Sequence, residues 1–177
     1  MEWFTAARKG RDDAFRQLLV EHHAPLFRFA YRLTGSVADA EDIVQECFLA
    51  LLDPARSYDP RRTPVRTYLF GAVRNQALKR LRERKDGRMR RPRHGRAIPE
   101  TEALRTEMAE VVARAVMRLP EMQREVLILA HYEAMPLAEI ARILNIELTA
   151  MKSRLQRARA NMKETLAAYA PAAEQRP

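Results

Sequence analysis

The residues with the most definite chemistry form a group of cations in the last third of the chain. Eight consecutive positions contain Lys152, Arg154, Arg157 and Arg159. Apolar residues recur among them at spacings of three and four, namely Met151, Leu155, Ala158 and Met162. This period predicts one helix with a buried face and a cationic outer face. Because Lys and Arg side chains attract phosphate groups, the pattern indicates a helix that binds a polyanion.

A second amphipathic stretch precedes the basic helix, over residues 137–144. Its apolar positions include Ala141, which is small enough to let the following helix approach closely. Asn145 comes next and tolerates the left-handed conformation that a tight turn needs. Two short helices joined in this way, the second of them cationic, are typical of a helix-turn-helix, which places its second helix in the DNA major groove. The alternative is a generic basic amphipathic helix.

Candidate catalytic residues are scarce. The chain has four histidines, and none stands at a spacing typical of a metal site or beside a paired carboxylate. The single cysteine, Cys47, lies in an apolar helical stretch, which favours a buried structural thiol over a redox sensor. We therefore expect no catalytic residue, no metal and no cofactor. An enzyme that acts on nucleic acid is the least favoured function.

The charge of the chain agrees with a nucleic-acid partner. Its 177 residues carry a formal net charge of +9. Such a charge favours a polyanionic partner over the alternative of ordinary basic solubility. The first residues lack the pattern of a secretory signal, and no apolar segment approaches the span of a bilayer. We expect a cytoplasmic protein with no membrane insertion.

The chain is predicted to be all-α, because Gly is scarce and apolar residues recur at helical spacing throughout. The first domain is expected over residues 1–86. Four helices are predicted there, over residues 12–25, 26–34, 36–52 and 65–84. Pro25 and Gly35 are expected to end the first two, and Ser36 to cap the third. A polar loop, residues 57–64, contains two prolines that resist helix formation.

A basic linker is predicted between two domains. Residues 79–96 contain ten Lys or Arg against two acidic residues, with glycine and proline interrupting the period. Like charges and few apolar residues make a packed core unfavourable, so residues 87–101 are assigned to a flexible linker. It is either a solvated tether or a tether that lies along an acidic surface or nucleic acid. The second domain is expected over residues 102–170, with a frayed tail at residues 171–177.

Four motifs follow one another along the two predicted domains. They are DAEDIVQECF at residues 39–48, TYLF and RN within residues 67–75, LP and REVL within residues 119–127, and EIA, MKSRL and RAR within residues 139–159. Together they resemble the motifs of bacterial RNA polymerase sigma factors of the small extracytoplasmic-function type, in the sigma-70 family. The resemblance implies that the first domain is sigma region two and the second is sigma region four, a helix-turn-helix.

The resemblance also implies roles for particular residues. An acidic helix face would dock on the clamp of the polymerase β′ subunit through Asp39, Asp42, Gln45 and Glu46. The loop and the helix after it would hold the melted minus-ten element through Asp59, Pro60, Arg61, Arg62, Thr63, Arg66, Thr67 and Asn75. The basic helix would read the minus-thirty-five element through Lys152, Ser153, Gln156 and Arg157. Arg154 and Arg159 are expected on phosphates or on the surface.

The implied partners are core RNA polymerase, through its β′ clamp and β flap, promoter DNA and an anti-sigma factor. The chain departs from the family pattern at several positions. Asn145 replaces a glycine, Tyr68 replaces a tryptophan, and Asp59–Pro60–Arg61 replaces Phe-Arg-Gly. Tyr68 is either a core aromatic or a stacking platform for a base.

A stand-alone helix-turn-helix regulator is the competing function. Such a regulator would bind duplex DNA without polymerase. It would need a ligand pocket or a dimer face in the first domain, where this chain has an acidic helix and a basic loop. A mobility shift with and without core polymerase distinguishes the two functions.

Overall fold

The computed structural model describes residues 12–53, 58–87 and 107–167. All elements in these ranges are helical, and no strand occurs among them. The elements form two compact units. The all-α prediction with two small helical domains is therefore confirmed. Apart from Gly87, the predicted linker lies outside the described residues, and so does the predicted tail. The exact domain boundaries stay predictions.

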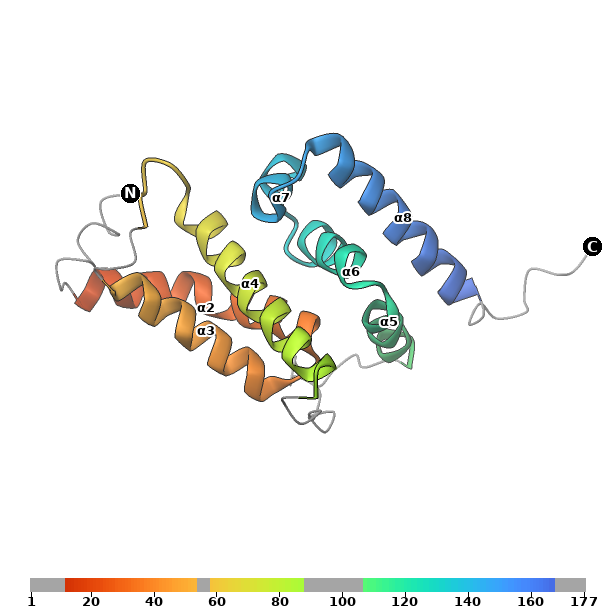
Figure 1. Ribbon diagram of the computed structural model, residues 1–177, viewed down its shortest axis with the longest axis horizontal. Coiled ribbons are helices and arrows are strands. Elements are labelled where there is room, and N and C mark those ends of the chain that lie inside the picture. Colours follow the sequence, from red (N-terminus) through yellow and green to blue (C-terminus); the bar gives the residue numbers. More distant parts are fainter. Residues whose placement is uncertain (1–11, 54–57, 88–106, 168–177) are drawn as a thin grey trace, which may run out of the picture. The chain divides into compact units, whose positions relative to one another are not determined.

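The first unit consists of three helices, each packed against the other two (Figure 1). They are α2 (Asp12–Thr34), α3 (Val37–Leu52) and α4 (Val65–Lys85). The side chains in the core come from all three helices and include Leu18, Leu26, Phe29, Ile43, Phe48, Leu69 and Phe70. The Phe29 and Phe70 rings lie 5.3 Å apart between centroids and join α2 to α4. Full burial of each such side chain contributes about 1.5–3 kcal/mol.

The prediction that Pro25 ends a helix is wrong, because α2 runs through it without interruption. A proline inside a helix removes one backbone hydrogen bond and costs about 3 kcal/mol. Leu18 precedes Pro25, Leu26 and Phe29 follow it, and all three are buried. We infer that the packing of these apolar residues against α3 and α4 offsets the lost hydrogen bond.

The predicted end of α2 and the predicted starts of α3 and α4 are confirmed. Gly35 has a φ of 69°, in the left-handed region that glycine adopts without strain, and it ends α2. The Ser36 hydroxyl then accepts a 3.3 Å hydrogen bond from the Asp39 amide and caps α3. Helix α4 begins at Val65, directly after Pro64. Cys47 is buried in α3, as predicted.

The second unit is organised around the longest of its helices, α8 (Leu148–Ala167). The same part of the chain also contains α5 (Glu107–Arg118), α6 (Glu121–Leu127), the π-helix η1 (Ile128–Tyr132) and α7 (Leu137–Leu144). Helix α8 packs against α6 and α5, and α7 joins η1 to α8 along the chain (Figure 1). No described helix is long and apolar enough to cross a membrane.

The π-helix was not predicted from the sequence. It widens the last turn of the α6 segment, and the chain then turns through Ala134, whose φ is 47°. Met135 closes this turn by donating its amide to the Leu129 carbonyl at 3.0 Å. A left-handed alanine is strained, because its Cβ crowds the backbone.

Candidate nucleic-acid interface

The basic helix α8 separates its side chains as the spacing predicted. Met151, Leu155 and Ala158 are buried. The residues assigned to minus-thirty-five reading are all exposed, namely Lys152, Ser153, Gln156 and Arg157. Apolar positions separated by four and three residues fall on one helix face, so the remaining positions turn to solvent. The helix thus presents a polar and cationic surface of the size that a major groove admits.

Two of these exposed side chains are held against the helix backbone. The Ser153 hydroxyl donates to the Thr149 carbonyl at 3.0 Å. The Arg157 Nε donates to the Ser153 carbonyl at 3.3 Å. Such contacts restrict the rotamers of both side chains. If these side chains bind DNA, less conformational entropy is then lost on binding.

The turn before α8 has the geometry that Asn145 predicted. Asn145 has a φ of 52°, and its amide donates to the Arg142 carbonyl at 3.2 Å. Asparagine tolerates this left-handed conformation better than most residues. The turn places α8 directly after α7, as a helix-turn-helix requires.

Arg154 and Arg159, which were expected on phosphates or on the surface, both have partners within the second unit. Arg154 Nη1 lies 3.6 Å from an oxygen of the buried Glu125 carboxylate on α6. Arg159 Nε donates to His131 Nε2 on η1 at 3.1 Å. Burial and, to a smaller extent, the charge of Arg159 lower the pKa of His131.

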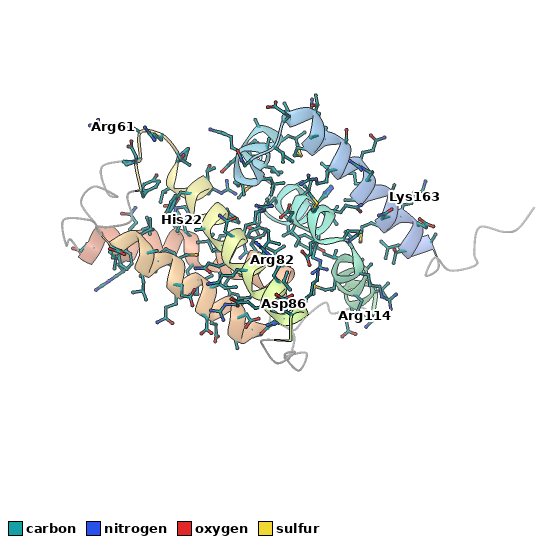
Figure 2. All side chains as sticks on the ribbon, viewed as in Figure 1. His22, Arg61, Arg82, Asp86, Arg114 and Lys163 are labelled. Atoms are coloured by element: carbon teal, nitrogen blue, oxygen red, sulfur yellow. The ribbon has the colours of Figure 1, made fainter. Side chains whose placement is uncertain are left out.

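In the first unit, the loop of residues 58–64 is organised by Asp59. Its carboxylate accepts a hydrogen bond from the Arg61 amide at 2.9 Å, and its carbonyl accepts one from the Arg62 amide at 3.1 Å. Arg61 and Arg62 are exposed, while Pro60 and Thr63 are half-buried. Figure 2 shows Arg61 at the outer end of the loop. The turn formed by Asp59 therefore directs two cations into solvent, where they can bind phosphates.

Tyr58 is a residue of this loop that the sequence analysis missed. Its hydroxyl donates to the Thr63 carbonyl at 2.6 Å, and its ring centroid lies 4.7 Å from that of Tyr68. Burial, followed by the charges of Asp59 and Tyr68, raises the pKa of Tyr58 to about 12. The signal available in the sequence was an aromatic residue at the start of an otherwise polar segment.

Helix α4 carries the remaining residues assigned to the minus-ten element. The Arg66 guanidinium lies 5.8 Å from the Phe70 ring centroid. Thr67 is buried, and Asn75 is exposed. At a rise of about 1.5 Å per residue, Asn75 lies roughly 10 Å further along the helix than Tyr68 and on the same face. Tyr68 and Asn75 therefore share one face of α4, whereas Thr67 is buried.

The acidic face of α3 carries the residues assigned to polymerase docking. Asp42, Gln45 and Glu46 are exposed, but Asp39 is buried. Arg80 of α4 reaches this face, with Nη1 lying 3.3 Å from the Asp42 carboxylate and Nη2 lying 2.8 Å from that of Glu46. The carboxylate of Asp39 pairs with Arg84, another residue of α4.

Asp39 thus differs from the other three docking residues in its surroundings. Its ion pair with Arg84 is inside the unit, and Arg84 also donates to the Thr34 carbonyl at the end of α2 at 3.1 Å. Asp39 therefore joins α3 to α4, and through Arg84 to the end of α2. The docking role of the exposed residues stays a prediction.

The described residues contain no cluster of three or more His, Cys, Asp or Glu side chains that could hold a metal ion. The candidate DNA-binding surfaces described above are instead made of cations, amides and hydroxyls on helix faces and on one loop. These groups bind phosphates and base edges without covalent chemistry.

Two parts of the chain match known family models. Residues 18–86 match the family model of sigma-70 region 2, and residues 109–162 match that of sigma-70 region 4. The chain is 33% identical over 155 residues to the ECF RNA polymerase sigma factor SigM of Mycobacterium tuberculosis, covering 86% of this chain and 77% of that protein.

Two further relatives cover more of their own length. The chain is 27% identical to the ECF RNA polymerase sigma factor SigW of Bacillus subtilis, over 90% of this chain and 92% of that protein. The sigma factor RpoE of Bartonella quintana, solved in complex with the anti-sigma factor NepR, has a TM-score of 0.70 and 26% identity. That match covers 86% of this chain and 96% of the solved chain. The chain therefore belongs to the extracytoplasmic-function sigma factors of the sigma-70 family.

Proposed function

We propose that this chain binds core RNA polymerase and directs it to promoters by recognising a minus-thirty-five and a minus-ten element. In this function it supplies no catalytic residue, because the polymerase performs the chemistry. The observation that carries the proposal is the division of α8 into a buried apolar face and an exposed face containing Lys152, Ser153, Gln156 and Arg157. That division leaves four side chains able to reach base edges and phosphates in a major groove.

The first unit would bind the melted minus-ten element. The exposed Arg61 and Arg62 of the loop carry the charge that single-stranded phosphates need. Asn75 on the exposed face of α4 offers an amide that can hydrogen-bond an unstacked base. In this proposal Asp59 organises the loop, and Thr67 supports it from the core.

The exposed acidic residues of α3 would dock on the clamp of the β′ subunit. Asp42 and Glu46 are the exposed carboxylates of this face, and although Arg80 pairs with both, their solvent side would face a basic partner. The positive charge elsewhere on the chain makes them a distinct patch. The second unit would dock on the β flap. A further proposed partner is an anti-sigma factor, which the solved complex of the Bartonella quintana relative supports by similarity.

The test is transcription in vitro with core polymerase on a library of promoters. The chain should direct initiation from a subset of promoters that share two elements. Lys152→Ala or Arg157→Ala should weaken recognition of the upstream element by about 1–3 kcal/mol if the lost contact is bidentate to a base. Lys163→Ala, at the other end of α8, is the matched control. An unchanged promoter profile with both reading-face variants would contradict the assignment.

Docking is tested separately. Asp42→Lys should abolish co-elution with core polymerase while the far-ultraviolet circular dichroism stays that of the wild type. If instead the purified chain fails to bind polymerase and binds duplex operators tightly by itself, it is a stand-alone regulator.

A further inference from the structure

Arg154 stands among the reading residues in the sequence, but its side chain turns towards the interior of the second unit. Its Nη1 lies 3.6 Å from Glu125 Oε1, and the side chains are 16% and 1% exposed. Lys152 and Ser153, its neighbours in the chain, are exposed. The two helices that the pair joins, α6 and α8, pack against each other.

Arg154 compensates the charge of the buried Glu125 carboxylate. A carboxylate as deeply buried as that of Glu125 is unfavourable unless a cation compensates it. If Arg154 left to bind a phosphate of DNA, it would leave that carboxylate with less compensation in the interior. The energy of the pair therefore opposes the use of Arg154 as a phosphate ligand.

Glu125 also stands on a firmly attached helix. The neighbouring Arg124 donates from one Nη2 to the carbonyls of Met117 at 2.7 Å and Leu119 at 3.0 Å, which fixes the start of α6 to the end of α5. Further along, Asn161 of α8 donates to Gln123 of α6 at 2.7 Å. Helix α8 is therefore tied to α6 by polar contacts at two positions along its length.

Contacts of this kind set the rotation of a helix about its own axis. Successive residues of a helix differ by about 100° around that axis, so fixing Arg154 fixes the directions of all its neighbours. A rotation of α8 would move the whole reading face together. It would misplace Lys152 and Gln156 relative to base edges even though neither side chain had changed.

We propose that Glu125 and Arg154 form a positioning pair that orients the reading face of α8, and that Arg154 does not bind DNA phosphate. The inference rests on the proposed function, because it assigns a role within promoter recognition. It makes Glu125, a buried acidic residue, a determinant of DNA recognition.

The test measures binding of reconstituted holoenzyme to a promoter selected from the library, and to the same fragment with its upstream element scrambled. The affinities are compared across salt concentrations. A phosphate ligand contributes about 0.9 to the slope of log K against log salt. A positioning residue leaves that slope unchanged but lowers the ratio of specific to scrambled binding, by about tenfold if one bidentate base contact is lost.

Both Arg154→Gln and Glu125→Gln should lower the ratio by similar factors at an unchanged slope. The double variant should lower it no further than either single change, because the two residues act through one contact. Lys163→Gln controls for the loss of one positive charge from α8. Thermal melting of each variant checks that the second unit is folded. Arg154→Lys keeps the charge and should retain part of the ratio of specific to scrambled binding.

The opposite result would overturn the proposal. In that case Arg154→Gln lowers the slope by about one, and Glu125→Gln binds as tightly as the wild type or more tightly, because it releases Arg154 for phosphate. Failure of the proposed function is distinguishable from this, since the wild-type chain would then form no holoenzyme at all.

Discussion

The hydroxyl of Tyr58 donates a 2.6 Å hydrogen bond to the main-chain carbonyl of Thr63. The bond closes the loop of residues 58–64, and the turn formed by Asp59 lies within it. The Tyr58 ring packs on Tyr68 in the first turn of α4. A side chain at the start of the loop thereby fixes the position of its end.

Tyr58→Phe removes this hydrogen bond and keeps the ring. We expect the free energy of unfolding to fall by about 1 kcal/mol, because a half-buried carbonyl loses a donor. If the loop binds the minus-ten element, promoter opening should also fall. Urea denaturation and permanganate footprinting of the melted region measure the two effects. Tyr68→Phe is the control, since it leaves the Tyr58–Thr63 bond in place.

The raised pKa of Tyr58 predicts a loss of stability at alkaline pH. The hydroxyl titrates near pH 10 in an unfolded chain and at about pH 12 in the folded protein. The folded state therefore favours the protonated form, and its contribution is complete below pH 10 and disappears as the pH rises towards 12. Urea denaturation at pH 8 and pH 11 should show a larger decrease for the wild type than for Tyr58→Phe. Equal decreases would show that another group is responsible.

The contrast between Asp39 and Asp42 separates folding from docking. The Asp39 side chain is 9% exposed and pairs with Arg84, so Asp39→Ala should destabilise the first unit by about 3 kcal/mol. The Asp42 side chain is 60% exposed, so Asp42→Ala should cost less than about 1 kcal/mol. Thermal denaturation of the two variants checks this difference. Similar losses of stability in both would contradict the structural role of Asp39.

The left-handed Ala134 predicts a stabilising substitution. Ala134→Gly relieves the strain at a φ of 47°, which outweighs the greater entropy that glycine loses on folding. We expect a gain of about 0.5 kcal/mol in the free energy of unfolding. Ala160→Gly, the same change at an exposed position inside α8, should instead cost about 1 kcal/mol. If both substitutions raise, or both lower, the free energy of unfolding, the explanation by backbone strain at Ala134 is wrong.

The contact between Arg159 and His131 predicts a loss of stability in acid. Burial and Arg159 lower the pKa of His131 below its usual 6.5, so the unfolded chain binds the proton first as the pH falls. Stability contributed by neutral His131 is therefore present above pH 6.5 and is lost as the pH falls through the lowered pKa. His131→Gln should show a flatter dependence of unfolding free energy between pH 7 and pH 5. His22 is retained in both proteins, so its own titration cancels in the difference.

Local patterns predicted the helices well where one period ran between clear boundaries. Helix α3 begins after the Ser36 cap and ends at Leu52, two residues before Pro54 in the sequence. Asn145 adopts the left-handed turn that its chemistry allows. The same reasoning failed at Pro25, which lies inside α2. Whether a helix can continue past a missing hydrogen bond depends on the packing around it, and a local sequence pattern does not report that packing.

Local sequence patterns could not predict contacts between residues that are far apart in the chain. Arg80 and Arg84 stood in a basic run that read as the approach to a linker, yet they pair with carboxylates of α3. Arg154 read as one cation among several, although its partner is Glu125 on another helix. Charge composition indicates a polyanionic partner, but only the fold shows which cations are already engaged.

The separation of faces on α8 has an evolutionary consequence. Lys152 and Gln156 are exposed, while Met151 and Leu155 form the packed side of the same helix. If the outward positions read the upstream element as proposed, substitutions there alter the preferred DNA sequence without disturbing the core. Paralogues within one genome could acquire distinct regulons through such changes while sharing a single scaffold.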